Sequence, residues 1–241
     1  MLQPWPLYSF PRLIGGGLVA GLLVLAAGCA VGPPVPATGE EPGIRVEADT
    51  LHLRGSIDRE LIPDFEAALE ANGDLDRVMV ESGGGDVETA LYFGALIHQA
   101  GLDVEVTGYG CLSSCANYIF PAGAARRIQP GAIVAWHGSA IQDDWNHEVT
   151  GEARESLDEL RRRQELFFEL VGVDERITIV GQDLQCECTW ALSESDMARF
   201  GLSPVKTPDD YENTDLSWAR GPGIRFLNLP EDVFDRIRSP R

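Results

Sequence analysis

The chain has 241 residues, with 38 acidic side chains against 19 lysines and arginines and a formal net charge of −19. This acidic balance argues against binding to the nucleic-acid backbone and against a basic membrane-binding face. The length is sufficient for one domain with a sizeable core and short for two.

The N-terminal segment has the composition of an export signal. Residues 1–28 carry a single charge, Arg12, ahead of an apolar, glycine-rich run that ends in Leu-Ala-Ala-Gly directly before Cys29. This end resembles a bacterial lipobox, in which the cysteine after the small residue is lipidated and becomes the new amino terminus. An ordinary signal peptide or an uncleaved anchoring helix are the alternatives. We therefore expect a lipoprotein anchored to the membrane through Cys29, extracytoplasmic and, in a Gram-negative bacterium, periplasmic.

Three segments of different composition follow the signal. Residues 29–43 are rich in proline and glycine without apolar periodicity, which predicts a flexible tether. Residues 44–207 carry the strand and helix patterns and form the expected domain. Residues 208–241 are rich in proline, glycine and acids and are expected to be an extension that wraps the domain.

Strand and helix patterns alternate through the first half of the domain. Strands are predicted at residues 50–57, 77–81, 104–106 and 132–136, and helices at 61–71, capped by Ser56 or Asp58, and at 87–100, closed by Gly101. This order predicts an α/β fold around a mainly parallel sheet with right-handed crossovers.

Downstream, an apolar face repeats along a charged helix at residues 152–171. Its three arginines, residues 161–163, lie among acids and are interpreted as a solvated face. A further short helix is expected at residues 174–182. Residues 190–201 predict a strand end, a Ser193 cap and a helix closed by Gly201.

Three features of the central segment can carry chemistry. The three glycines at residues 83–85 follow a strand, and their backbone N–H groups can cradle an anion. Ser113 and Ser114 lie in a small-residue turn that opens an apolar helix, where the helix dipole favours negative charge. His137 ends a strand. The carboxyl edge of a parallel sheet is the usual place for such groups to meet.

Together these features resemble the Clp-protease/crotonase superfamily, particularly its exported members. The resemblance rests on the order of the 82–87 glycine loop, Ser114 with Gly123 nine residues later, and His137 at a strand end, and it covers roughly residues 51–205. It implies a Clp/crotonase-like fold of repeated β-β-α/β-α units. It also implies a serine peptidase, independent of ATP, in which Ser114 attacks, His137 is the base, and the Gly85 and Cys115 amides hold the oxyanion.

Two assignments within this resemblance remain open. Ser113 competes with Ser114 as the nucleophile, and only the distance to Gly123 favours Ser114. The third member of a triad is missing, because Thr189 stands where the peptidases have an aspartate; three nearby substitutes are Asp183, Glu187 and Asp196. A serine–histidine dyad with an oxyanion hole retains some catalysis.

Each residue also has a structural explanation, as a tight turn for the glycines, a helix cap for Ser114 and a satisfied polar group for His137. A second hypothesis is therefore a non-catalytic binding module with the same fold. A third hypothesis, an acyl-CoA enzyme of the crotonase kind, is the least compatible with export, because coenzyme A belongs to the cytoplasm. The remaining histidines, His52, His98 and His147, are interpreted as structural or solvated, with His147 a second candidate for an active-site role.

The expected partners are a peptide or protein substrate and the membrane, with no nucleic acid. The resemblance implies a possible homo-oligomer built through the helix at 152–171. No metal or organic cofactor is required, since neither glycine motif matches a dinucleotide or nucleotide loop. Four cysteines remain after Cys29, and in an exported chain they favour two disulfides over a zinc site. Three pairings are open among them: Cys111, Cys115, Cys186 and Cys188.

Overall fold

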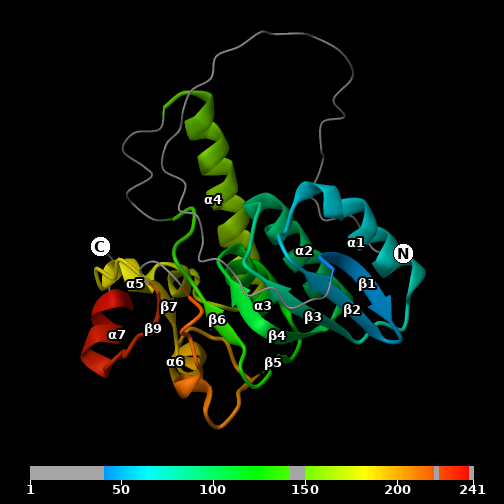
Figure 1. Ribbon diagram of the computed structural model, residues 1–241. Helices are drawn as coiled ribbons and strands as arrows, with labels where there is room; N and C mark the ends of the chain where they lie inside the picture. The colour runs from blue at the N-terminus through cyan, green and yellow to red at the C-terminus, as the bar shows by residue number, and fades with distance from the viewer. Residues whose placement is uncertain (1–40, 142–149, 220–222, 239–241) are drawn as a thin grey trace.

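The computed structural model describes residues 41–141, 150–219 and 223–238, which form an α/β fold with a mixed, mostly parallel sheet (Figure 1). The predicted signal segment, Cys29, nearly all of the tether and His147 lie outside the described residues. The α/β class predicted from the alternation of strands and helices is confirmed.

The main sheet has the strand order β1-β2-β3-β4-β5-β8, with β6 pairing with β4 beyond the end of β5. Only the β1–β2 pair is antiparallel among the described strands of this sheet. Its strands are β1 (Gly43–Glu47), β2 (Thr50–Arg54), β3 (Arg77–Ser82), β4 (Asp103–Leu112), β5 (Arg126–Ile128), β6 (Ile133–Ala135) and β8 (Val205–Lys206). A smaller parallel sheet joins β7 (Thr189–Ala191) to β9 (Ile224–Phe226).

β4 is longer than the predicted strand at residues 104–106, because it continues through a glycine-rich irregularity. Val80 of β3 pairs with Val106, whereas Ser82 pairs with Cys111, so extra residues of β4 bulge between these two pairs. Bulges of this kind interrupt the apolar alternation by which strands are recognised. The extension carries β4 as far as Leu112, next to the serine turn.

The helices begin and end largely where the sequence places them. Their bounds are η1 (Arg59–Leu61), α1 (Ile62–Ala71), α2 (Val87–Ala100), η2 (Cys115–Ile119), α3 (Phe120–Ala122), α4 (Glu152–Val171), η4 (Glu175–Thr178), α5 (Val180–Asp183), α6 (Glu194–Arg199), η5 (Tyr211–Asn213) and α7 (Glu231–Arg238). Gly101 closes α2 in the left-handed conformation and Ser193 caps α6 by accepting from the Asp196 N–H, both as predicted.

Two local predictions are wrong, and one strand was missed. A 3₁₀ turn leads into α1, and neither Ser56 nor Asp58 makes a side-chain cap. The helix expected at residues 174–182 is divided into η4 and α5. β1 was not predicted, because this five-residue edge strand directly follows the proline-rich segment and none of its residues is buried.

The extension after residue 207 packs against the domain where it is described. β9 pairs with β7, and the rings of Phe234 in α7 and Phe200 lie 5.0 Å apart. The ring of Trp218 contacts Tyr109 of β4 edge-on at 5.8 Å. The extension therefore buries aromatic side chains against the domain, although its overall composition is acidic.

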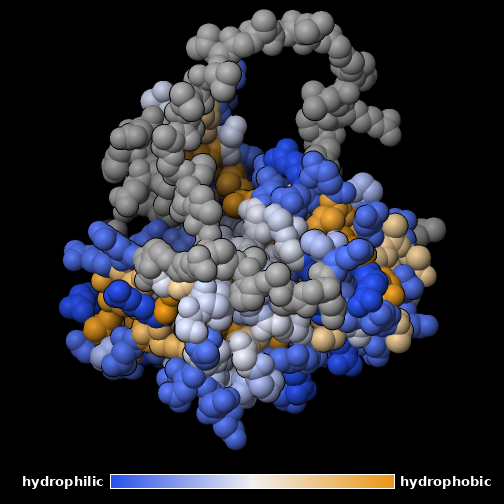
Figure 2. Space-filling model, viewed as in Figure 1, coloured by the Kyte–Doolittle hydropathy of each residue, from blue (hydrophilic) through white to orange (hydrophobic). Residues whose placement is uncertain are grey.

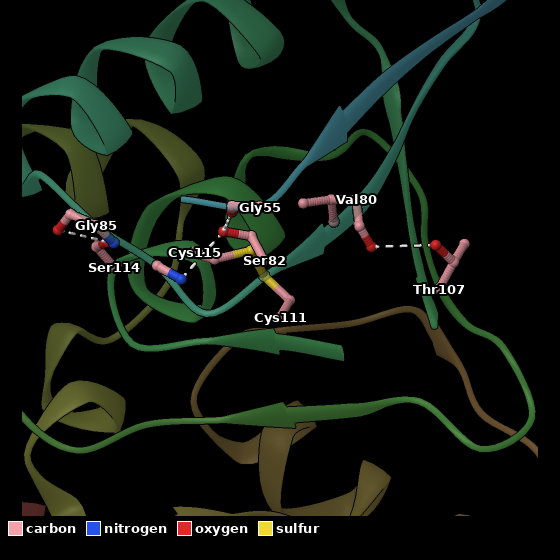
Figure 3. Close-up of a disulfide and its surroundings, with 9 residues drawn as sticks. Gly55, Val80, Ser82, Gly85, Thr107, Cys111, Ser114 and Cys115 are labelled. Atoms are coloured by element: carbon pink, nitrogen blue, oxygen red, sulfur yellow. Dashed lines mark hydrogen bonds between the residues drawn. A yellow bond between two sulfur atoms is a disulfide. The ribbon is translucent and has the colours of Figure 1, made fainter. Parts of the chain in front are cut away.

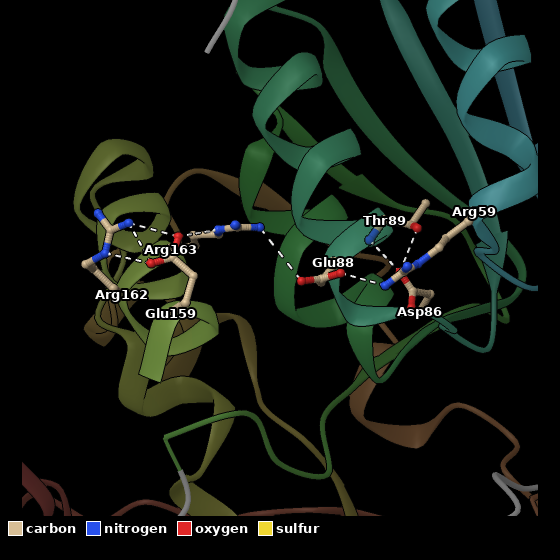
Figure 4. Close-up of polar contacts among 7 residues, drawn as sticks. All are labelled: Arg59, Asp86, Glu88, Thr89, Glu159, Arg162 and Arg163. Carbon is tan, nitrogen blue, oxygen red and sulfur yellow. Dashed lines mark hydrogen bonds and ion pairs between the residues drawn. The ribbon is translucent and has the colours of Figure 1, made fainter. Parts of the chain in front are cut away.

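α4 stands out from the body of the protein, with its N-terminal turns farthest from the sheet (Figure 1). Its C-terminal half is anchored by Phe167 and Phe168, both almost fully buried. The expected solvated face at residues 161–163 is only partly correct. Arg163 pairs with Glu159 at 2.8 Å and reaches Glu88 of α2 at 3.7 Å, so it ties α4 to α2 (Figure 4).

The face in Figure 2 is largely hydrophilic, and its hydrophobic residues appear as separate small areas. Among the described residues, Leu170 is the one large hydrophobic side chain counted as exposed, at 40%. Within the same residues, none of the helices combines the length and the apolar character needed to cross a membrane.

Phe65 provides a test of the core. Its side chain is fully buried and stacks on Phe93 with ring centroids 4.0 Å apart. We expect Phe65→Ala to lower the free energy of unfolding by about 3–5 kcal/mol, because it removes buried apolar area and leaves a cavity. Denaturant unfolding measures this, with the exposed Leu170→Ala as control, expected within about 0.5 kcal/mol of wild type. Equal losses in both variants would contradict this description of the core.

Candidate active site

The pairing of β4 with β6 brings two candidate residues together. Leu112 of β4 pairs in parallel with Ala135 of β6. Ser113 comes one residue after the paired position and His137 two residues after it, so both lie at the carboxyl end of adjacent strands. The His137 Nε2 atom lies 2.7 Å from the Ser113 Oγ atom, within hydrogen-bonding distance.

Ser113 occupies a turn that projects its hydroxyl. Its φ angle is +58°, in the left-handed region that costs a non-glycine residue about 1–3 kcal/mol. Its N–H donates to the Ala135 carbonyl at 3.0 Å, and its own carbonyl accepts from the Asn117 N–H at 2.9 Å. The side chain is partly exposed, so the hydroxyl is held between strand and helix and can be reached from outside.

Ser114 is directed elsewhere, contrary to the expected pairing of Ser114 with His137. Its side chain is buried, at 2% exposure. Its Oγ atom accepts from the Gly85 N–H at 2.8 Å and donates to the Gly85 carbonyl at 3.2 Å (Figure 3). Ser114 therefore joins the serine turn to the glycine loop, and the contact with His137 belongs to Ser113.

A π-helix explains why counting residues favoured Ser114. Residues Cys115–Ile119 form η2, in which the Phe120 N–H donates to the Cys115 carbonyl, five residues back. A π turn takes up one more residue than an α turn. The chain between the serine turn and Gly123 is correspondingly longer, so a nine-residue count reaches Ser114 where the structure presents Ser113.

The glycine loop is tied into the protein by two of its own amides. The Gly84 N–H donates to Ser82 Oγ at 3.0 Å, and the Gly85 N–H donates to Ser114 Oγ. Gly85, expected as an oxyanion donor, therefore already has an acceptor. Ser82, which sequence reasoning did not single out, also donates from its Oγ to the Gly55 carbonyl at 2.6 Å. A serine before a glycine run carries no distinct signal for this role.

Free backbone donors lie instead at the start of the helix after Ser113. The first amide of this helix to find an acceptor is that of Asn117. The Ser114 and Cys115 amides donate to no acceptor in the part of the chain that the structure describes. Such unsatisfied N–H groups carry the positive end of the helix dipole. They can stabilise negative charge that develops beside Ser113, and Cys115 is one of the two donors expected from the sequence.

His137 is exposed, and its surroundings favour the neutral form of its ring. Partial loss of hydration lowers its pKa below the ordinary value, while a hydrogen bond with its own backbone carbonyl acts in the opposite direction. Its backbone is fixed on both sides. The Gln182 side chain donates to the His137 carbonyl at 3.3 Å, and the Asn117 side chain donates to the Gly138 carbonyl at 3.0 Å. A neutral imidazole beside a hydroxyl can accept its proton.

No carboxylate hydrogen-bonds to the His137 ring within residues 41–141, 150–219 and 223–238. Asp196 instead accepts from Ser193 and pairs with Arg199 at 3.0 Å. Asp183 ends α5, half-buried, and Glu187 is exposed. Thr189 begins β7 and pairs with Ile224. Among the described residues, Ser113 and His137 thus form a pair without a third member. None of the three acids expected as substitutes hydrogen-bonds to the His137 ring.

The cysteines pair locally, in one of the three arrangements that the sequence left open. Cys111 is joined to Cys115, with Cα atoms 5.3 Å apart, and Cys186 to Cys188, with Cα atoms 5.1 Å apart. A bridge from the serine turn to the segment around Cys186 is not formed. Instead, the backbone of Trp136 pairs with that of Trp190 at 2.8 Å in both directions and holds these segments together.

The two remaining described histidines are placed as structural residues. His52 lies in β2 with its Nε2 atom 3.6 Å from a carboxylate oxygen of Glu47, and His98 lies in the last turn of α2. Neither is part of the Ser113–His137 pair.

A comparison of the sequence with known families and curated proteins finds no match. The resemblance to Clp-type peptidases therefore rests on the motifs and their arrangement alone.

Gly84 tests the close packing of this site. Its φ angle is +92°, and a Cβ atom there would lie 2.8 Å from Ser113 Cβ and 2.9 Å from Ser114 Oγ. Gly131 is a matched control, since its φ is +82° and a Cβ atom would meet nothing within 4 Å. We expect Gly131→Ala to cost about 1–2 kcal/mol of unfolding free energy from backbone strain. Gly84→Ala should cost more, because the glycine loop must also move away from both serines.

Denaturant unfolding of the two variants provides the comparison. Equal losses would show that the glycine loop does not press against the serine turn, and the site described here would then be too loosely packed to hold Ser113 in place.

Proposed function

We propose that this protein is a membrane-tethered, extracytoplasmic serine hydrolase that acts on peptide bonds without ATP. The observation that carries the proposal is the 2.7 Å contact between Ser113 Oγ and His137 Nε2, beside two backbone amides that have no acceptor among the described residues. A hydroxyl, a neutral base and oxyanion donors are the parts that acyl transfer needs.

In this mechanism the Ser113 hydroxyl attacks the substrate carbonyl while His137 Nε2 takes the hydroxyl proton. The Ser114 and Cys115 amides donate to the oxygen that becomes negatively charged. The tetrahedral intermediate collapses as His137 returns the proton to the leaving amine, and an acyl-Ser113 ester remains. A water molecule, deprotonated by the same imidazole, then hydrolyses the ester and frees Ser113.

The proposal includes a Clp/crotonase-like arrangement of repeated β-β-α/β-α units, and it is supported by the mixed, mostly parallel sheet and by the order of the motifs. Two local disulfides fit an exported protein. A lipid on Cys29 would tether the domain to the membrane, and a peptide or protein would be the substrate. No step of the mechanism calls on a metal or organic cofactor.

A second function is favoured by one observation. The His137 ring is oriented by no carboxylate within the described residues, and loss of that group costs serine proteases about 10⁴ in kcat. Turnover is therefore expected to be slow. The alternative function is a binding module that keeps the fold without useful catalysis. Covalent labelling of the nucleophile distinguishes a slow hydrolase from a binding module better than a measurement of turnover does.

A fluorophosphonate probe tests the nucleophile. Ser113 Oγ attacks the phosphorus, fluoride leaves, and His137 takes the hydroxyl proton, which leaves a stable phosphonyl ester. We expect the wild type to be labelled, Ser113→Ala to lose labelling, and His137→Gln to slow it by about 10²–10⁴-fold because the base is removed. Ser114→Ala keeps the nucleophile and should remain labelled, more slowly, since it frees Gly85.

Each contrary outcome has a definite meaning. A wild type that is not labelled, with the fold intact by circular dichroism, would favour the binding module. Loss of labelling in Ser114→Ala alone would return the nucleophile to the residue that the sequence favoured.

The pH dependence of labelling tests the base. Since the His137 pKa lies below its ordinary value of 6.5, the ring is neutral at neutral pH. The labelling rate should stay constant from about pH 8 to pH 6.5 and fall only as the pH drops through the lowered pKa. Stopped labelling at a series of pH values, beside an NMR titration of the imidazole, measures both curves. An inflection above pH 6.5, or the same inflection in His137→Gln, would contradict the assignment.

A further inference from the structure

The turn that presents Ser113 is enclosed by a disulfide. Cys111 and Cys115 stand two residues before and two residues after Ser113, so their bond closes a five-residue ring with Ser113 at its centre. Both cysteines have no exposed surface. Ser113 adopts the left-handed conformation without being glycine, and such a residue persists only when its surroundings hold it there.

The two ends of this ring belong to different rigid elements. Cys111 pairs with Ser82 of β3 and with Val134 of β6, so it is fixed within the sheet. Cys115 is the first residue of η2, whose five residues are all buried. The disulfide therefore sets the distance between the end of β4 and the first turn of the helix, and it lies beneath the turn in the core (Figure 3).

Hydrogen bonds alone leave this turn less constrained. The Ser113 N–H and carbonyl make one backbone bond each, and the Ser114 hydroxyl contacts Gly85. The Ser114 contact fixes the turn only relative to the glycine loop, which is itself held by hydrogen bonds. A covalent link across the same five residues restricts the path between strand and helix regardless of that loop.

We propose that the Cys111–Cys115 disulfide is a positioning element for the nucleophile, which holds Ser113 in its left-handed turn with Oγ toward His137. The inference rests on the proposed function for its catalytic meaning, whereas the geometry of the turn can be measured without activity. The sulfurs touch neither substrate nor reacting atoms. They act through the backbone of Ser113.

The second disulfide provides a matched control. Cys186 and Cys188 also form a local bond, and the one residue between them, Glu187, is exposed. Removing either pair deletes two sulfur atoms from the protein, but only the Cys111–Cys115 bond encloses Ser113.

The test compares the full-length wild type, Cys111→Ala/Cys115→Ala and Cys186→Ala/Cys188→Ala. One measurement is the fluorophosphonate labelling rate, and the other is hydrogen exchange of the Ser113 and Asn117 amides, which donate to Ala135 and Ser113. We expect the first double variant to label about 10–100-fold more slowly, as for a reacting group displaced by about 1 Å, and to exchange these two amides faster. The control should match the wild type in both measurements.

Labelling and exchange of Cys111→Ala/Cys115→Ala at wild-type rates would overturn the inference and leave the proposed function standing. If the wild type is not labelled, the proposed function fails, and amide exchange alone decides the positioning. Should the double variant fail to fold, the same two measurements on wild type purified under reductant, with thiols confirmed by alkylation and mass, replace it. Unchanged amide exchange in the reduced protein overturns the inference.

Discussion

The parallel pairing of β4 with β6 is the constraint on which the candidate site depends. Because Leu112 and Ala135 are paired, the residues just beyond them leave the sheet side by side, and a hydroxyl meets an imidazole. The rest of the sheet supports this edge. β3 lies on the other side of β4 and ends in the glycine loop, and the Trp136–Trp190 pair fastens β6 to the segment that leads into β7.

Around this edge, several polar side chains hold the backbone of neighbouring segments. Ser114 holds Gly85, Ser82 holds Gly84, and Asn117 holds the Gly138 carbonyl next to His137. Behind them a buried network runs from Tyr118 to Gln164 of α4 and on to Ser139, so the helix that stands out from the body also supports the strand end. Buried polar groups that are satisfied in this way specify one arrangement of the chain.

Within the described residues, Ser113 and His137 form a pair without a third member, and the proposed function depends on what this pair can do alone. An exposed imidazole with a lowered pKa is neutral at neutral pH and accepts a proton without prior deprotonation. Two amides at the helix start have no acceptor among the described residues and are donors for negative charge that develops beside Ser113, a role separate from that of a group that orients the ring. Under the proposed function, this arrangement favours formation of an acyl or phosphonyl adduct over rapid turnover.

The sequence by itself determined the class of fold, the glycine loop, the serine turn and the strand-end histidine, because these depend on local periodicity and on residues with restricted backbone conformations. It also determined the Ser193 cap and the Gly101 end of α2. Only the tertiary structure decided which serine meets His137, since a π-helix shifts the count by one residue and pairing across β4 and β6 selects Ser113. The absence of a carboxylate from the His137 ring among the described residues is likewise set by contacts between distant segments, which local patterns do not encode. The cysteines pair with near neighbours in the sequence, but the sequence left three pairings open and the folded structure decided among them.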